Sequence, residues 1–202
     1  MRLHALVSNL AAAERAIADG ATVVQLRLKG VSSDELVEIG RSIRGPCAAA
    51  GVTFVVNDDV DAALRAGADG AHLGRDDSGS EWVRTAGLLL GLSASNPDEA
   101  RDAEARGAAY VGAGPVWPTP SKPDAGPPLG LDGLAEICRA VAVPVVAIGG
   151  VDTTNAAECI HAGAAGVAVI RAVAELRELR AVVDAALASS AIVPSRDDSR
   201  AR

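Results

Sequence analysis

Short apolar runs alternate with amphipathic stretches along most of the chain. Eight of these runs are apolar on both faces, which is typical of parallel strands covered by helices. The predicted strands are Leu3–Val7, Thr22–Leu28, Thr53–Asn57, Gly70–Leu73, Leu89–Ser93, Ala109–Ala113, Val143–Ile148 and Gly166–Ile170. The helices predicted between them include Ala11–Asp19, Ser33–Ala50, Pro97–Arg106, Leu131–Val141 and Asn155–His161.

A Gly-Ala pair recurs where a predicted helix gives way to a strand. The pairs are Gly20-Ala21, Gly67-Ala68, Gly107-Ala108 and Gly163-Ala164, before every second strand. Glycine there can adopt the left-handed conformation that ends a helix. The repeat predicts an α/β fold, a single (β/α)8 TIM barrel over residues 1–188, with a disordered tail over 189–202. A doubly wound open sheet is the alternative, but no Gly-x-Gly-x-x-Gly motif follows the first strand.

The composition of the chain excludes several classes of binding partner. The 202 residues carry a net charge of −7 and only four Phe, Trp or Tyr rings, which argues against nucleic-acid binding. There is no run of about 18 apolar residues, so we expect no membrane span. The three cysteines lack zinc-site spacing, and we expect reduced, mostly buried thiols in a cytoplasmic protein. The pattern leaves open whether the chain forms homo-oligomers.

Cationic side chains follow the second predicted strand. In a (β/α)8 barrel the active site lies at the carboxyl ends of the strands. Alternation along Gln25-Leu26-Arg27-Leu28-Lys29 directs Gln25, Arg27 and Lys29 to one side. Such cations favour an anionic ligand, and the alternative is an ion pair with an acid such as Asp58.

Acids appear abruptly at the ends of the next two strands. Asn57-Asp58-Asp59 ends the third strand, and Asp76 and Asp77 follow the fourth. Acids at adjacent strand ends can share Mg²⁺, which takes one or two carboxylates together with waters and phosphate oxygens. We interpret Asp59 and Asp76 as a helix cap or solvated acids, and Asp58 and Asp77 as candidate metal ligands.

The remaining strand ends carry hydroxyls, glycines and cations. The candidates are Ser93, the Pro/Gly-rich loop residues Thr119, Pro120, Ser121 and Lys122, the pair Gly149-Gly150, and Ile170-Arg171. Glycine after the seventh strand and amides after the eighth are typical of a phosphate site. We find no nucleophilic triad and interpret His4, His72 and His161 as structural. Two anion sites and one metal site predict group transfer at a carbon that bears a diphosphate leaving group.

Six ordered motifs give the chain a family resemblance over about residues 3–188. They are Val24–Lys29, Val56–Val60, Gly70–Asp77, Gly91–Ser93, Tyr110–Lys122 and Val145–Val151. In these motifs the sequence resembles the thiamine-phosphate synthase family. The resemblance implies a barrel that couples hydroxymethylpyrimidine diphosphate to hydroxyethylthiazole phosphate, giving thiamine phosphate and pyrophosphate. It further implies a dissociative, Mg²⁺-assisted reaction in which the diphosphate leaves before the thiazole nitrogen attacks.

The resemblance also implies roles for individual residues. Asp58 and Asp77 would ligate Mg²⁺, and Arg27, Lys29, Ser93 and Lys122 would be catalytic. The residues that would bind the pyrimidine diphosphate are Gln25, Leu26, Arg27, Leu28, Lys29, Asn57, Ser93 and Lys122. The thiazole phosphate would bind Thr119, Pro120, Ser121, Gly150 and the amides of Ile170 and Arg171.

The sequence departs from the family pattern at a few positions. Leu28 stands where the family usually has Glu, Arg171 where it often has Ser, and Ser95 where a His is common. Arg171 could grip the phosphate bidentately or crowd the site. Two alternatives stay open: a thiazole tautomerase-like paralogue, and a non-catalytic barrel that binds a phosphate ligand. Another phosphate-binding barrel enzyme would need an acid/base pair that we do not find.

Overall fold

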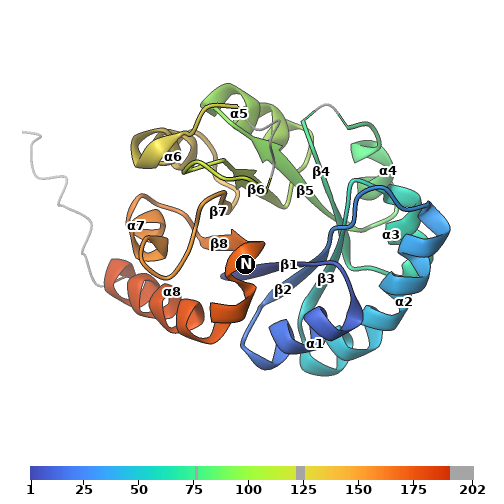
Figure 1. Cartoon of the computed structure of the whole chain (residues 1–202). Coiled ribbons are helices and arrows are strands. Elements are labelled where there is room, and N and C mark those ends of the chain that lie inside the picture. The colour runs from blue at the N-terminus through green and yellow to red at the C-terminus, as the bar shows by residue number, and fades with distance from the viewer. Residues whose placement is uncertain (76, 122–125, 192–202) are drawn as a thin grey trace, which may run out of the picture.

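The computed structural model describes residues 1–75, 77–121 and 126–191 and shows a closed barrel of eight parallel strands in chain order. The strands are β1 Leu3–Val7, β2 Val23–Leu26, β3 Thr53–Asn57, β4 Gly70–Leu73, β5 Leu89–Ala94, β6 Tyr110–Ala113, β7 Val145–Ile148 and β8 Gly166–Val169. The helices are α1 Leu10–Ala18, α2 Ser33–Ala50, α3 Val60–Ala66, α4 Ser80–Thr85, α5 Pro97–Ala105, α6 Gly130–Ala140, α7 Ala156–His161, the 3₁₀ helix η1 Arg171–Glu175 and α8 Leu176–Ala191. The α-helices surround the strands (Figure 1), so the predicted (β/α)8 barrel is confirmed.

Most predicted boundaries lie within a residue or two of the observed ones. β7 starts at Val145 rather than Val143 because Pro144 has no N–H for the strand ladder. β2 ends at Leu26, so the prediction of a strand to Leu28 is wrong by two residues. The Arg27 N–H still donates to the Val7 carbonyl at 2.8 Å, which keeps the start of the loop on the barrel. Helix α8 runs to Ala191, so the expectation of a disordered tail is wrong for residues 189–191, and residues 192–202 lie outside the described residues.

Helix ends follow the local sequence signals. The four glycines of the Gly-Ala repeat all have positive φ, between 69° and 108°, which confirms their predicted left-handed conformation. Asn96 caps α5, because its side chain accepts the Glu99 N–H at 2.9 Å and Pro97 fills the first helical position. Asn96 sets where α5 begins, and the four glycines set where the helices before them stop and the next strands begin.

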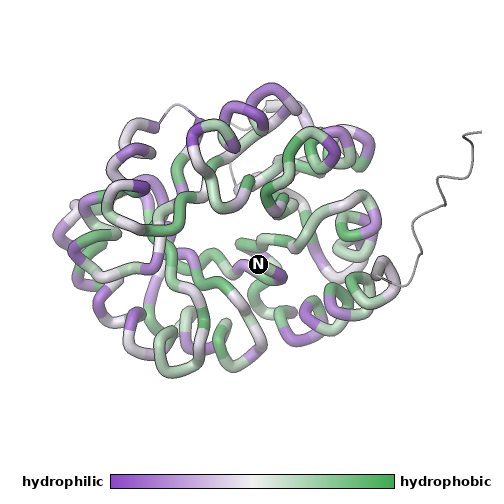
Figure 2. The backbone as a smooth tube through the Cα atoms, turned by 180° about the vertical axis from the view of Figure 1, so that it is seen from behind, coloured by the Kyte–Doolittle hydropathy of each residue, from purple (hydrophilic) through white to green (hydrophobic). Residues whose placement is uncertain are grey.

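Apolar side chains form two separate clusters, one on each side of the strands. The larger cluster fills the layer between strands and helices and is built mainly of Ala, Val and Leu. The smaller one, Leu6, Tyr110, Val146 and Ala168, lies inside the barrel. Figure 2 shows hydrophilic residues concentrated on the outer helices, as this layering requires. No helix among the described residues is long and apolar enough to cross a membrane.

The cysteines belong to the outer layer or its edge. Cys47 and Cys159 are buried, Cys138 is half-buried, and all three are free thiols. Burial raises the pKa of Cys47 and Cys138 to about 11 and that of Cys159 to about 12. The thiols are therefore protonated at neutral pH, in agreement with the expected packing role.

Glycines leave room for polar side chains inside the barrel. Neighbouring strands place Asn57, His72, Gly91 and Tyr110 in one register row. A Cβ at Gly91 would lie 2.3 Å from the Tyr110 ring and 2.6 Å from His72 Nδ1. Gly91 is therefore required because two large side chains cross the barrel at its position.

Candidate functional site

The polar candidates lie at the carboxyl ends of the strands, the end of the barrel that carries catalytic residues in this fold. Gln25 is 4% exposed and is held by Asn57, to whose Oδ1 its Nε2 donates at 2.7 Å. This bond joins β2 to β3 and satisfies a buried amide. It fixes the Gln25 and Asn57 side chains at one side of the mouth.

The two cations after β2 are Arg27 and Lys29. Within the described ranges neither Arg27 nor Lys29 forms an ion pair, so the expected alternative of an ion pair with Asp58 is wrong. Both cations act on Asp58 at longer range. Their charge lowers the pKa of Asp58, although burial and Asp77 raise it overall. Leu26 is fully buried in the outer apolar cluster and Leu28 packs against it, so these two leucines alternate with the polar side chains.

Asp58 and Asp77 form a pair of carboxylates at the ends of β3 and β4. Asp58 has φ 65°, and its N–H donates to the His72 carbonyl at 2.8 Å, which turns the chain sharply at the strand end. Asp77 accepts the Gly74 N–H at 2.7 Å. Burial, the negative charge of Asp77 and a hydrogen bond between the two side chains raise the pKa of Asp58.

This pair fits a divalent cation. Two close carboxylates repel each other when both are ionised, and a cation between them relieves that repulsion. Within the described parts of the chain no group of three or more His, Cys, Asp and Glu side chains could hold a metal. Two carboxylates are nevertheless the protein share that Mg²⁺ takes where phosphate and water supply the other ligands.

The neighbouring acids behave differently. Asp59 caps α3, since its Oδ1 accepts the Ala62 N–H at 2.8 Å, which agrees with its predicted role as a helix cap. Asp76 lies outside the described residues. Glu99 accepts bonds from the Ser95 N–H and hydroxyl and from Arg75 at 2.7–2.8 Å. Although burial opposes it, these bonds lower the pKa of Glu99, and they tie the loop after β4 to the start of α5.

A chain of hydrogen bonds runs inward from Ser93 at the end of β5. The Ser93 hydroxyl lies 3.0 Å from His72 Nε2, and the Tyr110 hydroxyl lies 3.0 Å from His72 Nδ1. The edge of the buried His4 ring meets Tyr110 with ring centres 5.1 Å apart. Burial lowers the pKa of His4 to about 3, so His4 stays neutral and structural, as predicted.

The loop after β6 is fastened to the end of β7. The Val116 and Trp117 N–H groups donate to the Ile148 and Gly149 carbonyls, each at 3.0 Å. Farther along, the Ser121 N–H donates to the Thr119 hydroxyl at 3.3 Å. Lys122 lies outside the described residues. The fastening brings Trp117 and Pro118, which precede Thr119, against the Gly149-Gly150 turn predicted for phosphate.

A substitution at Gly150 tests how closely the loop after β6 packs against the turn after β7. Its φ is +70°, and a Cβ there would lie 2.6 Å from Trp117 Cβ and 3.1 Å from the Pro118 carbonyl. We expect Gly150→Ala to lower the melting temperature clearly more than Gly51→Ala, which has φ +65° and open space. The control carries only the left-handed backbone strain of about 1–2 kcal/mol. Equal losses in thermal unfolding would contradict the close loop contact.

Residues after β8 complete the mouth. Ile170 packs against the inner apolar cluster, and the exposed Arg171 begins η1. Asn155 supports the Gly149-Gly150 turn after β7, since its Nδ2 donates to the Gly150 carbonyl at 2.9 Å. Arg171 and the Gly149-Gly150 turn thus follow neighbouring strands, as a phosphate site in this fold requires.

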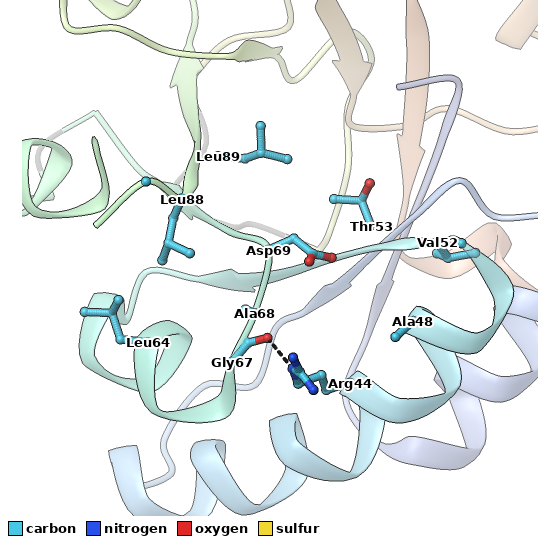
Figure 3. Close-up of a pocket in the computed structure, with 12 residues that line it drawn as sticks. Arg44, Ala48, Val52, Thr53, Leu64, Gly67, Ala68, Asp69, Leu88 and Leu89 are labelled. Carbon is cyan, nitrogen blue, oxygen red and sulfur yellow. Dashed lines mark hydrogen bonds between the residues drawn. The ribbon is translucent and has the colours of Figure 1, made fainter. Parts of the chain in front are cut away.

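A hollow of about 680 Å³ lies at the opposite, amino end of the barrel. Figure 3 shows it between the residues that lead into β3, β4 and β5. Its polar groups already serve the fold, because Arg44 Nε donates to the Gly67 carbonyl and Asp69 accepts the Phe54 N–H, each at 2.8 Å. This end contributes stability in such barrels, and it is not our candidate site.

Sequence reasoning missed two residues of this region. The sequence predicts a structural role for His72 and a strand position for Tyr110, whereas the structure joins both side chains to Ser93. The alternation of β4 could have identified His72, since it shares the inward face with Gly70. The pairing of Gly91 with Tyr110 needed the barrel register, which the sequence does not display.

Comparisons with known proteins show which sequences and structures the chain is similar to. Residues 4–173 match the family model described as thiamine monophosphate synthase. The chain is 48% identical over 181 residues to thiamine-phosphate synthase of Methanocella arvoryzae, covering 85% of each chain. It is 44% identical to that of Roseiflexus sp., covering 99% of this chain and 88% of the relative. Among solved structures, thiamine phosphate pyrophosphorylase from Pyrococcus furiosus superposes with a TM-score of 0.84 at 34% identity, over 92% of this chain and 96% of that one.

Proposed function

The chain belongs to the thiamine monophosphate synthase family, and on that premise we propose that it joins hydroxymethylpyrimidine diphosphate to hydroxyethylthiazole phosphate. The products are thiamine phosphate and pyrophosphate, which makes the protein a transferase of thiamine biosynthesis. The observation that carries the proposal is the Asp58–Asp77 pair facing the cations Arg27 and Lys29 at one barrel mouth. A metal-bound diphosphate is the ligand that such mixed charges suit.

The proposed reaction needs no general base. The bond between the pyrimidine methylene carbon and the diphosphate oxygen breaks, and pyrophosphate leaves with the electron pair. The lone pair of the thiazole nitrogen then forms the new carbon–nitrogen bond, and no proton moves. Catalysis therefore rests on stabilising the negative charge that grows on the leaving group.

The residues divide into three groups in this proposal. Arg27, Lys29 and Ser93 contact the diphosphate end, with Lys122 as a further cation of the loop after β6. Gln25 and Asn57, already joined by a hydrogen bond, orient the pyrimidine. Gly150, Thr119, Ser121, the Ile170 amide and Arg171 hold the thiazole phosphate.

Asp58 and Asp77 would hold Mg²⁺. When bound, this ion would neutralise diphosphate charge and favour its departure. The raised pKa of Asp58 supports this assignment, because a cation between the two carboxylates would offset the repulsion from Asp77 that contributes to the shift.

The direct test is to incubate the full chain with both substrates and Mg²⁺ and to measure thiamine phosphate and pyrophosphate. We expect both products in equal amounts, and no coupling when either substrate or Mg²⁺ is omitted. Failure to form thiamine phosphate at high enzyme concentration would exclude the synthase. Conversion of the thiazole alone would instead indicate the tautomerase-like alternative.

Arg171→Ser tests the thiazole phosphate site. Arg171 is exposed at the start of η1, so its guanidinium can reach a phosphate near Gly150 without leaving a buried charge. We expect the KM for thiazole phosphate to rise about tenfold, since a charge-assisted bond is lost, with little change in kcat. A lower KM would show that Arg171 crowds the site rather than gripping the phosphate.

A further inference from the structure

The hydrogen-bonded chain Ser93–His72–Tyr110 passes from the mouth of the barrel into its interior. Exposure falls along it, since Ser93 and His72 are half-buried and Tyr110 is 1% exposed. Glycines on neighbouring strands leave space for the imidazole, and a Cβ at Gly112 would lie 3.0 Å from His72 Cε1. The ring is therefore enclosed on the inner side of the barrel, with Ser93 between it and the mouth.

Tyr110 fixes the direction of these hydrogen bonds. Its ring lies in the inner apolar cluster with Leu6, Val146 and Ala168. Burial raises the pKa of Tyr110 well above its ordinary value, so the phenol keeps its proton. Among the described residues the hydrogen-bond partner of this hydroxyl is His72 Nδ1, at 3.0 Å. A buried O–H without an acceptor is costly, so Tyr110 donates to Nδ1.

The direction at Nδ1 determines the direction at Nε2. A neutral imidazole has one donor and one acceptor nitrogen, and Nδ1 is here the acceptor. Nε2 then carries the proton and donates to the Ser93 hydroxyl oxygen, 3.0 Å away. The hydrogen of the Ser93 hydroxyl is left to point elsewhere, toward the mouth. The opposite tautomer, or an imidazolium, would leave the buried Tyr110 O–H without this acceptor.

We propose that His72 is a positioning residue, which Tyr110 holds as the Nε2–H tautomer, and which presents the Ser93 hydroxyl to the substrate as a hydrogen-bond donor. Donation suits a ligand of acceptor atoms, namely diphosphate oxygens or pyrimidine ring nitrogens, and disfavours a donor group at the same place. The identity of that ligand rests on the proposed function, whereas the tautomer does not.

The tautomer can be measured without substrate. Nitrogen-15 spectra of the full chain labelled at histidine, with His72→Gln used to assign the ring, report which nitrogen bears hydrogen. We expect His72 to be protonated at Nε2 and unprotonated at Nδ1 near neutral pH. An Nδ1–H tautomer or an imidazolium would overturn the proposal, whether or not the chain forms thiamine phosphate.

A double-mutant cycle tests whether Tyr110 acts through Ser93. We expect Tyr110→Phe to lower kcat/KM about tenfold in the wild-type background, the value of one hydrogen bond. In the Ser93→Ala background the same change should have less than about a twofold effect, because the group that it orients is gone. A tenfold loss in both backgrounds would overturn the positioning role.

Val146→Ala controls for packing, since Val146 is 1% exposed in the same inner cluster. We expect it to lower the melting temperature while kcat stays near the wild-type value. If it lowers kcat as much as Tyr110→Phe does, the effect of Tyr110 is one of packing alone and the proposal is overturned. Absence of coupling activity in the wild-type chain would contradict the proposed function, and the spectra would still decide the tautomer.

Discussion

Asp58→Asn is expected to lower Mg²⁺-dependent turnover by about 10²- to 10³-fold. The change removes one of the two carboxylates of the proposed metal site and keeps the shape of the side chain. Asn is the suitable substitution because Asp58 has φ 65°, a left-handed conformation that Asn adopts readily and Ala does not. Steady-state coupling rates over a range of Mg²⁺ concentrations measure the effect.

The matched control is the adjacent acid. Asp59 caps α3 through its side-chain oxygen, and Asn caps helices as well as Asp does. Asp59→Asn should therefore retain both melting temperature and turnover while removing the same charge. If Asp59→Asn loses turnover as strongly as Asp58→Asn, the loss reflects the total negative charge at the mouth of the barrel. The assignment of Asp58 as a metal ligand is then wrong.

The same variant has a predicted effect on stability. The pKa of Asp58 is raised by folding from its ordinary value of 3.8, so the folded state holds that proton more tightly than the unfolded state. The contribution is complete below the unfolded pKa and is lost as pH rises through the folded pKa. Without metal, Asp58→Asn should therefore gain melting temperature relative to wild type as pH rises from about 4 to about 7. Mg²⁺ should raise the melting temperature of the wild type but not of this variant.

Much of the fold could be predicted from the sequence because its signals are local. The apolar runs, the helix caps and the Gly-Ala repeat are each encoded in a few consecutive residues. β2 shows the limit, because the pattern of Thr22–Leu28 continues through Leu28 while the ladder ends at Leu26. The predicted strand length is therefore wrong, whereas Arg27 and Lys29 both lie close enough to Asp58 to lower its pKa.

The functional side chains at the strand ends could be predicted from the sequence, whereas those inside the barrel were harder to predict. Asp58 and Asp77 lie in separate motifs, yet adjacent parallel strands necessarily bring such ends together. The link between His72 and Tyr110 spans 38 positions and depends on glycine at 91, whose place beside Tyr110 follows from the pairing of β5 with β6. The direction of a hydrogen bond depends on which buried group lacks another partner, and only the packed interior shows that.

We expect Arg27→Gln to lower catalytic activity without lowering thermal stability. Among the described residues Arg27 forms no ion pair, and it lies close enough to Asp58 to lower the pKa of that acid. Its removal therefore breaks no salt bridge among the described residues. We expect an almost unchanged melting temperature, and kcat/KM lower by about 10²- to 10³-fold because charge stabilisation of the leaving diphosphate is lost.

Arg65→Gln is the control with the opposite profile. Arg65 pairs with Asp34 at 2.6 Å and with Asp61 at 3.0 Å on the outer helices. Its loss should lower the melting temperature slightly and leave turnover unchanged, since exposed ion pairs contribute little and lie outside the mouth. The Mg²⁺-induced rise in melting temperature should persist or grow in Arg27→Gln, because a cation near the acid pair has been removed. If that rise is instead lost together with turnover, Arg27 supports the metal site and not the diphosphate.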